Sequence, residues 1–254
     1  MKVQPRPLIG VLCLVVYLAA FYGVWIVNDI DYDAIGDSAD TLLTWYVMPL
    51  VVGCLVLVVL ASVLGWWRPA IVETARVPRW AAVPGVLMAL LAALVLLTKD
   101  FSDTTGQMLV YLVLGSIGVG FGEEMANRGL LLTGLRGSLS EPWVWFWTCA
   151  CFGLMHLPNW VFGAGPVATY QVLTAFLAGS TFYLLRRATG SLVWAMLVHG
   201  FNDFAAFAGD GGAWMALVTP FIGLTSLVMV VVLLRREKGV HHVPQGATPL
   251  PAPA

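Results

Sequence analysis

Residues 8–27 read LIGVLCLVVYLAAFYGVWIV, twenty consecutive residues without a charge. An α-helix needs a stretch of about this length to cross the hydrocarbon core of a bilayer. The same character recurs along the chain, because 59% of its 254 residues are hydrophobic and only 11% are charged. Such a composition excludes a disordered chain and is not typical of a soluble domain. It predicts an all-α fold in a polytopic integral membrane protein.

Eight apolar stretches are long enough, or nearly so, to be membrane helices. Irregular backbone interrupts the fifth at Pro158-Asn159, which a bilayer tolerates where the backbone is buried or lines a cavity. The stretches lie at about 8–27, 45–65, 80–98, 107–134, 143–162, 166–185, 191–208 and 213–234. The expected organisation is helices one to three in 1–106, a core of helices four to seven in 107–208, a last membrane helix in 209–238 and a disordered tail in 239–254.

The basic residues alternate along the chain in a way that predicts the orientation of the helices. With a cytoplasmic N-terminus, eleven of the thirteen Lys and Arg residues fall in cytoplasmic segments, Lys99 falls outside and Arg128 lies within a span. This bias follows the positive-inside rule, so we expect a multi-pass plasma-membrane protein with both termini in the cytoplasm. A net charge of −1 creates no field that attracts nucleic acid, and the lipid bilayer is the expected partner. The sequence does not specify an oligomeric state.

Six ionisable residues fall within the expected spans, where a charged side chain costs roughly 2.5–3.5 kcal/mol on insertion scales. Glu124 and Arg128 are four apart and share a helix face, whereas Glu123 is rotated by about 100°. His199 and Asp203 are also four apart, so the carboxylate can accept the second ring N–H of the histidine. Helix geometry places the groups at similar depths, between the midplane and the cytoplasmic leaflet. The six are Glu123, Glu124, Arg128, His156, His199 and Asp203.

Two histidines and a carboxylate on three helices favour a hydrolytic site of one of two kinds. In one, His156 and His199 hold a water molecule that Glu123 deprotonates. In the other, the same three residues bind a divalent metal, zinc before others, with an open position for water. Arg128 offsets negative charge, and Asp203 orients His199 or, when protonated, donates to an oxyanion. The competing class is a proton-coupled transporter, which the lack of an internal repeat disfavours.

Three short motifs in spans four to seven resemble those of the CAAX protease and bacteriocin-processing family, also called the Abi or type II CAAX prenyl endopeptidase family. The family pattern EExxxR corresponds to residues 123–128, FxxxH to residues 152–156, and HxxxN or HxxxD to residues 199–203. Each motif is short, but their order and their places in membrane helices make the combination specific. The HExxH motif of helix-borne zinc peptidases is absent.

The resemblance implies an intramembrane endopeptidase in which Glu123 is the general base, and His156 and His199 hold the water or a metal. It implies that Asp203 stabilises the oxyanion or orients the site. The supporting positions are Glu124 and Arg128. The implied substrates are membrane-associated proteins or peptides, prenylated CAAX-type proteins among them, and the prenyl-protein branch suits a site that opens toward the inner leaflet. Other branches imply a non-catalytic alternative, a bacteriocin-immunity or membrane-scaffold protein.

Overall fold

The structure is a computed structural model, and it describes residues 1–209 and 211–248. Within these residues all regular elements are helical, and the only β pairing is an isolated bridge between Val72 and Ser191, which confirms the all-α fold class. The long helices are α1 (Pro7–Val27), α3 (Met48–Leu64), α5 (Val83–Leu96), α6 (Gly106–Glu124), α8 (Glu141–Leu154), α9 (Val167–Thr189), α10 (Leu192–Phe207) and α11 (Met215–Leu234).

Short helical elements extend or connect the long helices. Two of them are π-helical, η2 (Leu42–Val47) between α2 and α3 and η4 (Met125–Leu131) between α6 and α7. The short α-helices are α2 (Ala39–Thr41), α4 (Trp67–Ile71) and α7 (Leu132–Leu135). The 3-10 turns are η1 (Tyr32–Ala34), η3 (Arg79–Ala82), η5 (Leu157–Trp160) and η6 (Arg235–Glu237).

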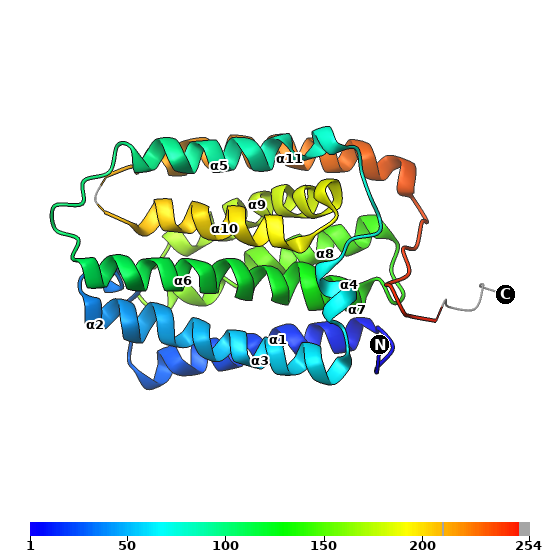
Figure 1. Ribbon diagram of the computed structural model, residues 1–254, viewed down its shortest axis with the longest axis horizontal. Helices are drawn as coiled ribbons and strands as arrows, with labels where there is room; N and C mark the ends of the chain where they lie inside the picture. The colour runs from blue at the N-terminus through cyan, green and yellow to red at the C-terminus, as the bar shows by residue number, and fades with distance from the viewer. Residues whose placement is uncertain (210, 249–254) are drawn as a thin grey trace.

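The long helices run side by side along the longest axis of the molecule (Figure 1). In this view α1 and α3 lie at one edge and α5 and α11 at the opposite edge, with α6 and α10 between them and α8 and α9 behind. The most extensive contacts join α6 to α10, α9 to α11, α8 to α9 and α1 to α3. The centre of the bundle is therefore formed by α6, α8, α9 and α10, the helices expected to carry the polar cluster.

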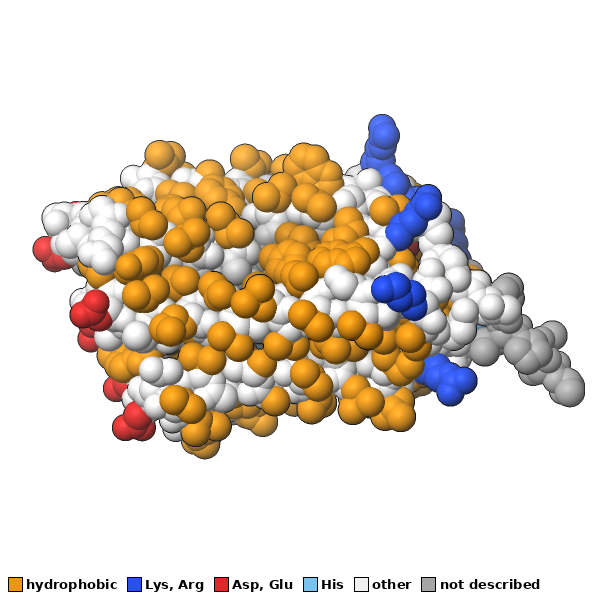
Figure 2. Space-filling view, turned by 60° about the horizontal axis from the view of Figure 1, so that its bottom comes forward, with side chains coloured by type: hydrophobic (Ala, Val, Ile, Leu, Met, Phe, Trp, Pro, Cys, Tyr) orange, Lys and Arg blue, Asp and Glu red, His pale blue; other side chains and the backbone are white. Residues whose placement is uncertain are grey.

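The surface divides into an apolar middle and two charged ends (Figure 2). We call the end that carries the loops 28–38 and 97–105 the acidic end, and the end that carries the loop 65–78 and residues 235–238 the basic end. Large apolar side chains face outward between them, among them Ile117, which is 64% exposed, and Leu55, which is 60% exposed. Soluble monomers rarely expose so much contiguous apolar surface. The chain is an integral membrane protein.

In the part of the chain that the structure describes, five helical segments are long and apolar enough to cross a membrane. They are Pro7–Val27, Ala39–Leu64, Arg79–Leu96, Gly106–Leu135 and Met215–Glu237. Each of the eight expected stretches coincides with a helix, but α8, α9 and α10 fall outside this set, so eight membrane helices are not confirmed. The largest difference is in α8, which ends at Leu154 instead of continuing to residue 162. The proline at position 158 explains it, because proline disrupts a helix interior by removing a backbone donor.

Backbone contact between α6 and α10 depends on glycine. A Cβ atom on Gly120 would overlap the carbonyl oxygen of Met196, and one on Gly200 would meet the carbonyl oxygen of Ser116. Small residues allow such close approach between membrane helices. We therefore expect Gly120→Ala to destabilise the protein by about 1–3 kcal/mol, since a backbone carbonyl cannot move aside as a flexible side chain can.

Thermal unfolding in detergent measures this effect against a matched control. Gly23 lies within α1, and a Cβ atom there would meet nothing within 4 Å. Gly23→Ala should therefore leave the unfolding temperature unchanged or raise it, because alanine is the better helix former by about 1 kcal/mol. If both variants unfold at the temperature of the wild type, the close packing of α6 on α10 is wrong.

The segment after η6 folds back on the basic end. The backbone N–H of Glu141 donates to the carbonyl of Val240 at 3.0 Å, and the N–H of Thr248 donates to the side chain of Gln4 at 2.9 Å. Residues 239–248 contain no helix. The rest of the tail expected to be disordered, residues 249–254, lies outside the described residues.

Candidate active site

The first motif lies where α6 changes into the π-helical turn η4. π-Helical turns within α-helices occur frequently at functional sites. Arg128 donates from Nη1 to Oε1 of Glu124 at 2.9 Å, and both side chains are fully buried. The guanidinium of Arg128 also lies 3.9 Å from the centroid of the Phe152 ring, in cation–π geometry. The expected Glu124–Arg128 pair is thus present, and the second motif contributes the aromatic ring that covers it.

Glu124 also contacts His199, which the close packing of α10 on α6 brings alongside it. Nδ1 of His199 lies 3.0 Å from Oε1 of Glu124, and the Phe182 ring stacks on the imidazole with centroids 4.5 Å apart. A carboxylate accepts hydrogen bonds, so in the neutral imidazole Nδ1 carries the proton and Nε2 is an acceptor.

This arrangement differs from the expectation that Asp203 holds the second ring N–H of His199. Oδ1 of Asp203 lies 4.0 Å from Nε2, the opposite nitrogen, while Glu124 occupies the Nδ1 side. The reason is that the carboxylate that holds the ring comes from the neighbouring helix. The spacing of His199 and Asp203 along α10 could not reveal a partner 75 residues away in the sequence.

His156 follows the end of α8 and has the same ring orientation. Its Nδ1 lies 2.8 Å from the carbonyl oxygen of Phe152. A carbonyl only accepts, so Nδ1 donates and Nε2 remains an acceptor. The Phe152 ring contacts both imidazoles edge-on, with centroids 5.4 Å from His156 and 5.6 Å from His199. Both histidines are therefore held by one nitrogen and present the other.

The two presented nitrogens face the carboxylate of Glu123. Oε2 of Glu123 lies 3.8 Å from Nε2 of His156 and 3.8 Å from Nε2 of His199, and it has no hydrogen-bond partner. A separation of 3.8 Å is too long for a direct hydrogen bond and is one that a bridging water can fill. Three acceptor atoms converge here, so the group between them must donate protons or carry positive charge.

The side chains of His156, His199 and Glu123 are of the types that bind zinc. However, among residues 1–209 and 211–248 no group of three His, Cys, Asp or Glu side chains is arranged to hold a metal ion. The described geometry thus does not form a ready metal site. A water molecule can bridge the 3.8 Å separations between Glu123 and the two histidines.

A cavity of about 140 Å³ gives solvent access to these groups. The side chain of Asp203 is 22% exposed, that of Glu123 is 13% exposed and that of His199 is 7% exposed. Exposure therefore decreases from Asp203 toward the pair of Glu124 and Arg128, which are fully buried. The other walls of the cavity are largely aromatic and include Tyr17, Phe21, Tyr22, Trp25, Tyr32 and Tyr46.

A chain of hydrogen bonds along one wall of the cavity was not expected from the sequence. The Tyr22 hydroxyl contacts the carbonyl of Met155 at 2.6 Å and Oδ1 of Asn159 at 3.2 Å, Asn159 donates to Gln171 at 2.9 Å, and Gln171 donates to the hydroxyl of Tyr32 at 3.2 Å. The chain joins α1, η5, α9 and η1 around the groups that face Glu123. Two features of the sequence could have indicated this chain: the amide side chain at position 171, within an apolar stretch, and the asparagine at position 159, just after α8 ends.

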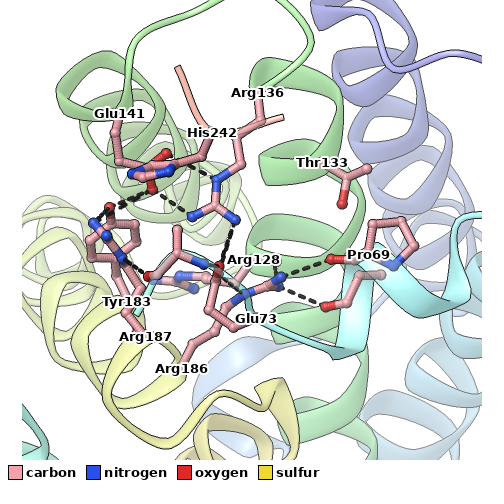
Figure 3. A network of polar contacts seen from close by, with 12 residues as sticks. Pro69, Glu73, Arg128, Thr133, Arg136, Glu141, Tyr183, Arg186, Arg187 and His242 are labelled. Atoms are coloured by element: carbon pink, nitrogen blue, oxygen red, sulfur yellow. Dashed lines mark hydrogen bonds and ion pairs between the residues drawn. The ribbon is translucent and has the colours of Figure 1, made fainter. Parts of the chain in front are cut away.

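A second charged cluster is buried between the site and the basic end (Figure 3). Glu73 accepts from Arg136 at 3.0 Å and from Arg186 at 2.7 Å, and Glu141 accepts from Arg136 and from the hydroxyl of Tyr183, each at 2.6 Å. Burial alone would raise the pKa of Glu73, but the guanidinium groups of Arg136 and Arg186 outweigh it and lower this pKa to about 2. We call these five residues the buried ion network.

Three arginines of the segments expected in the cytoplasm are buried in the structure. Arg136, Arg186 and Arg187 lie in segments expected in the cytoplasm, but their side chains are only 7%, 0% and 1% exposed. The sequence contains a sign of this burial. The segments expected in the cytoplasm carry three carboxylates, and each of them is paired with one of these arginines. Those carboxylates are Glu73, Glu141 and Glu237.

The part of the chain that carries these residues is similar to a known protein family. The family model described as type II CAAX prenyl endopeptidase Rce1-like matches residues 105–205, from the N-cap of α6 into α10. No curated protein matches the chain. The matched segment contains all six ionisable residues of the site, and it confirms the resemblance carried by the three motifs. Residues 105–205 are thus similar to the Rce1-like family of type II CAAX prenyl endopeptidases.

Proposed function

We propose that the protein is an intramembrane endopeptidase that hydrolyses peptide bonds of membrane-associated proteins or peptides. The observation that carries the proposal is the unpartnered Oε2 of Glu123, which faces Nε2 of His156 and Nε2 of His199 at 3.8 Å. A carboxylate beside two acceptor nitrogens is suited to hold a water and to remove its proton. The family match is consistent with that chemistry.

In the proposed mechanism a water molecule lies between Glu123 and the two imidazoles and donates one of its two hydrogens to Glu123 and the other to Nε2 of a histidine. Glu123 removes a proton as the water oxygen attacks the carbonyl carbon of the scissile bond, and the carbonyl oxygen becomes an oxyanion. Asp203, in its protonated form, donates to that oxyanion. Glu123 then transfers the proton to the amine nitrogen as the C–N bond breaks. Glu124 positions His199 throughout.

We also propose that all eight long helices cross the membrane, in the plasma membrane, with the basic end in the cytoplasm. α9 and α10 contribute Gln171, His199 and Asp203 to the cavity wall, and the segment after α8 contributes to it as well; polar side chains and irregular backbone are tolerated at such a place. Residues 4 and 248 lie together at the basic end, since the backbone N–H of residue 248 donates to Gln4. The bilayer is therefore the permanent partner of the protein.

Cleavage assays with a panel of quenched peptides test the proposed function. The panel contains membrane-inserting peptides with and without a prenylated cysteine, since prenylated CAAX-type proteins are one substrate class that the family supports. Purified protein is expected to cleave at least one peptide, and mass spectrometry identifies the bond. An immunity or scaffold protein would cleave none, and a proton-coupled transporter would instead move solute in proteoliposomes with a pH gradient.

The same assay separates a water held by the side chains from a bound metal. If Glu123, His156 and His199 hold a water molecule and no metal ion, a strong chelator leaves the cleavage rate unchanged and added zinc does not raise it. Loss of activity with chelator, and its return with zinc, would instead assign His156, His199 and Glu123 as metal ligands. Metal content of the purified protein, measured by mass spectrometry, provides a readout that does not depend on activity.

A further inference from the structure

The lining of the cavity that contains Glu123 extends toward the acidic end. Beyond the site residues, its lining includes Trp25 near the end of α1, Tyr32 and Ile35 in the loop 28–38, and Phe207 at the end of α10. These elements meet in one apolar cluster at the acidic end, together with residues of the loop 97–105. Phe207 is 46% exposed, so the lining reaches the surface of the bundle there.

In the opposite direction the site is closed by tightly packed side chains. Arg128 is fully buried behind Glu124, and Phe152 and Phe182, which cover it and His199, are 2% and 1% exposed. Behind them lies the buried ion network, in which Arg186 donates to the backbone carbonyls of Ala70 and Arg128 (Figure 3). Buried side chains therefore fill the layers between the site and the basic end in the described part of the chain.

The two ends of the bundle differ in charge, as the cytoplasmic and outer ends of membrane proteins do. Exposed Lys and Arg side chains gather at the basic end, and exposed Asp and Glu side chains gather at the acidic end (Figure 2). Positively charged residues favour the cytoplasmic side of a membrane protein, and acidic residues contribute little to orientation. The end that is closed to the site is therefore the end expected in the cytoplasm.

We infer that water and substrate reach Glu123 from the acidic end, which faces away from the cytoplasm. The substrates would be peptide segments presented at the outer face of the membrane or from its outer leaflet. A lipidated segment held in the inner leaflet would meet the closed end, contrary to the expectation of a site that opens toward the cytoplasm. The substrate part of this inference rests on the proposed function, but the direction of access does not.

Cysteine labelling tests the direction of access without any need for activity. Asp203→Cys places a thiol in the cavity, and Gln171→Cys provides a second position should the first variant fold poorly. Asp37→Cys marks the acidic end and Lys238→Cys marks the basic end, since both residues are exposed. A charged, membrane-impermeant thiol reagent is applied to intact cells or to inverted vesicles, and the unmodified protein gives the background from its four cysteines.

We expect the cavity thiol to react from the same side as Asp37→Cys, at least tenfold faster than from the side of Lys238→Cys. Reaction from the Lys238 side would overturn the inference. Failure of both cavity thiols to react from either side, in folded protein, would also overturn it, because the cavity would then have no aqueous entrance. Reaction of Asp37→Cys in intact cells shows that the acidic end is extracellular, and its reaction only in inverted vesicles would overturn that part.

Cleavage in sealed vesicles then tests the substrate side. An impermeant quenched peptide that the detergent-solubilised protein cleaves is added to right-side-out and to inverted vesicles, each before and after permeabilisation. We expect cleavage in sealed right-side-out vesicles and, in inverted vesicles, only after permeabilisation. The reverse pattern would overturn the inference. If no preparation cleaves any peptide, the proposed function fails, while the labelling result still decides the direction of access.

Discussion

Glu123→Gln is expected to lower kcat for peptide cleavage by about 10²–10⁴-fold, the usual contribution of a general base. Glutamine has the size of glutamate but cannot accept the proton of the attacking water. The substitution should not disturb the fold, because Oε2 makes no hydrogen bond and the side chain lies beside the cavity. KM should change little, since the amide still occupies the same space next to the substrate. Steady-state kinetics at equal concentrations of folded protein measure both values.

The control for this variant makes the same chemical change at the surface. Asp37 lies in the loop 28–38 and is exposed, so Asp37→Asn also converts a carboxylate to an amide. It should leave kcat within a factor of two of the wild type. A Glu123→Gln protein that retains the kcat of the wild type would reject Glu123 as the base and leave the site without an acceptor for the proton.

Glu73→Gln is expected to reduce the free energy of unfolding by about 3–5 kcal/mol at neutral pH. The substitution removes the negative charge that faces Arg136 and Arg186 while both guanidinium groups stay buried. A buried charge that loses its partner is strongly destabilising, whereas a more exposed pair contributes little. Glu237 is the matched control, because its side chain is 20% exposed and pairs with Arg187. Arg187 is itself buried, but water reaches the Glu237 side of the pair, so Glu237→Gln should cost less than Glu73→Gln.

The effect of Glu73 should also depend on pH. Its pKa is lowered from an ordinary 4.5 to about 2 in the folded protein, because Arg136 and Arg186 outweigh the effect of burial. A lowered pKa stabilises the folded state above the unfolded pKa, and this stabilisation is lost as pH falls from 4.5 to about 2. The two values correspond to about 3 kcal/mol. Unfolding in detergent should therefore separate Glu73→Gln from the wild type at pH 7, and the difference should shrink below pH 4. A difference that stays constant would contradict this role.

Much of the architecture follows from patterns that are local in the sequence. Each of the eight apolar stretches coincides with a long helix, because a span is specified by length and composition alone. The cluster of Glu123, His156 and His199 was found for a similar reason, since charged groups in apolar stretches are costly and rare. Helix geometry was sufficient to predict that the three would lie at compatible depths.

What the sequence did not reveal depends on contacts between segments far apart in the chain. The partner of His199 is Glu124 because α6 packs against α10, and spacing within one helix indicated Asp203 instead. Arg186 lies in the buried ion network because the loop that carries Glu73 folds over the end of α9. The direction in which the cavity opens is likewise a property of packing, and hydropathy and charge along the chain carry no information about it.

The most direct test of the central claim is peptide hydrolysis in water enriched in ¹⁸O, followed by mass spectrometry of the products. The measurement compares wild-type protein with Glu123→Gln on the same peptide. We predict that the wild type produces a new C-terminal carboxylate with one ¹⁸O atom and that the variant produces essentially none. Labelled product at equal rates from both proteins, or no product from the wild type with any peptide of the panel, would contradict the claim that Glu123 activates water for peptide cleavage.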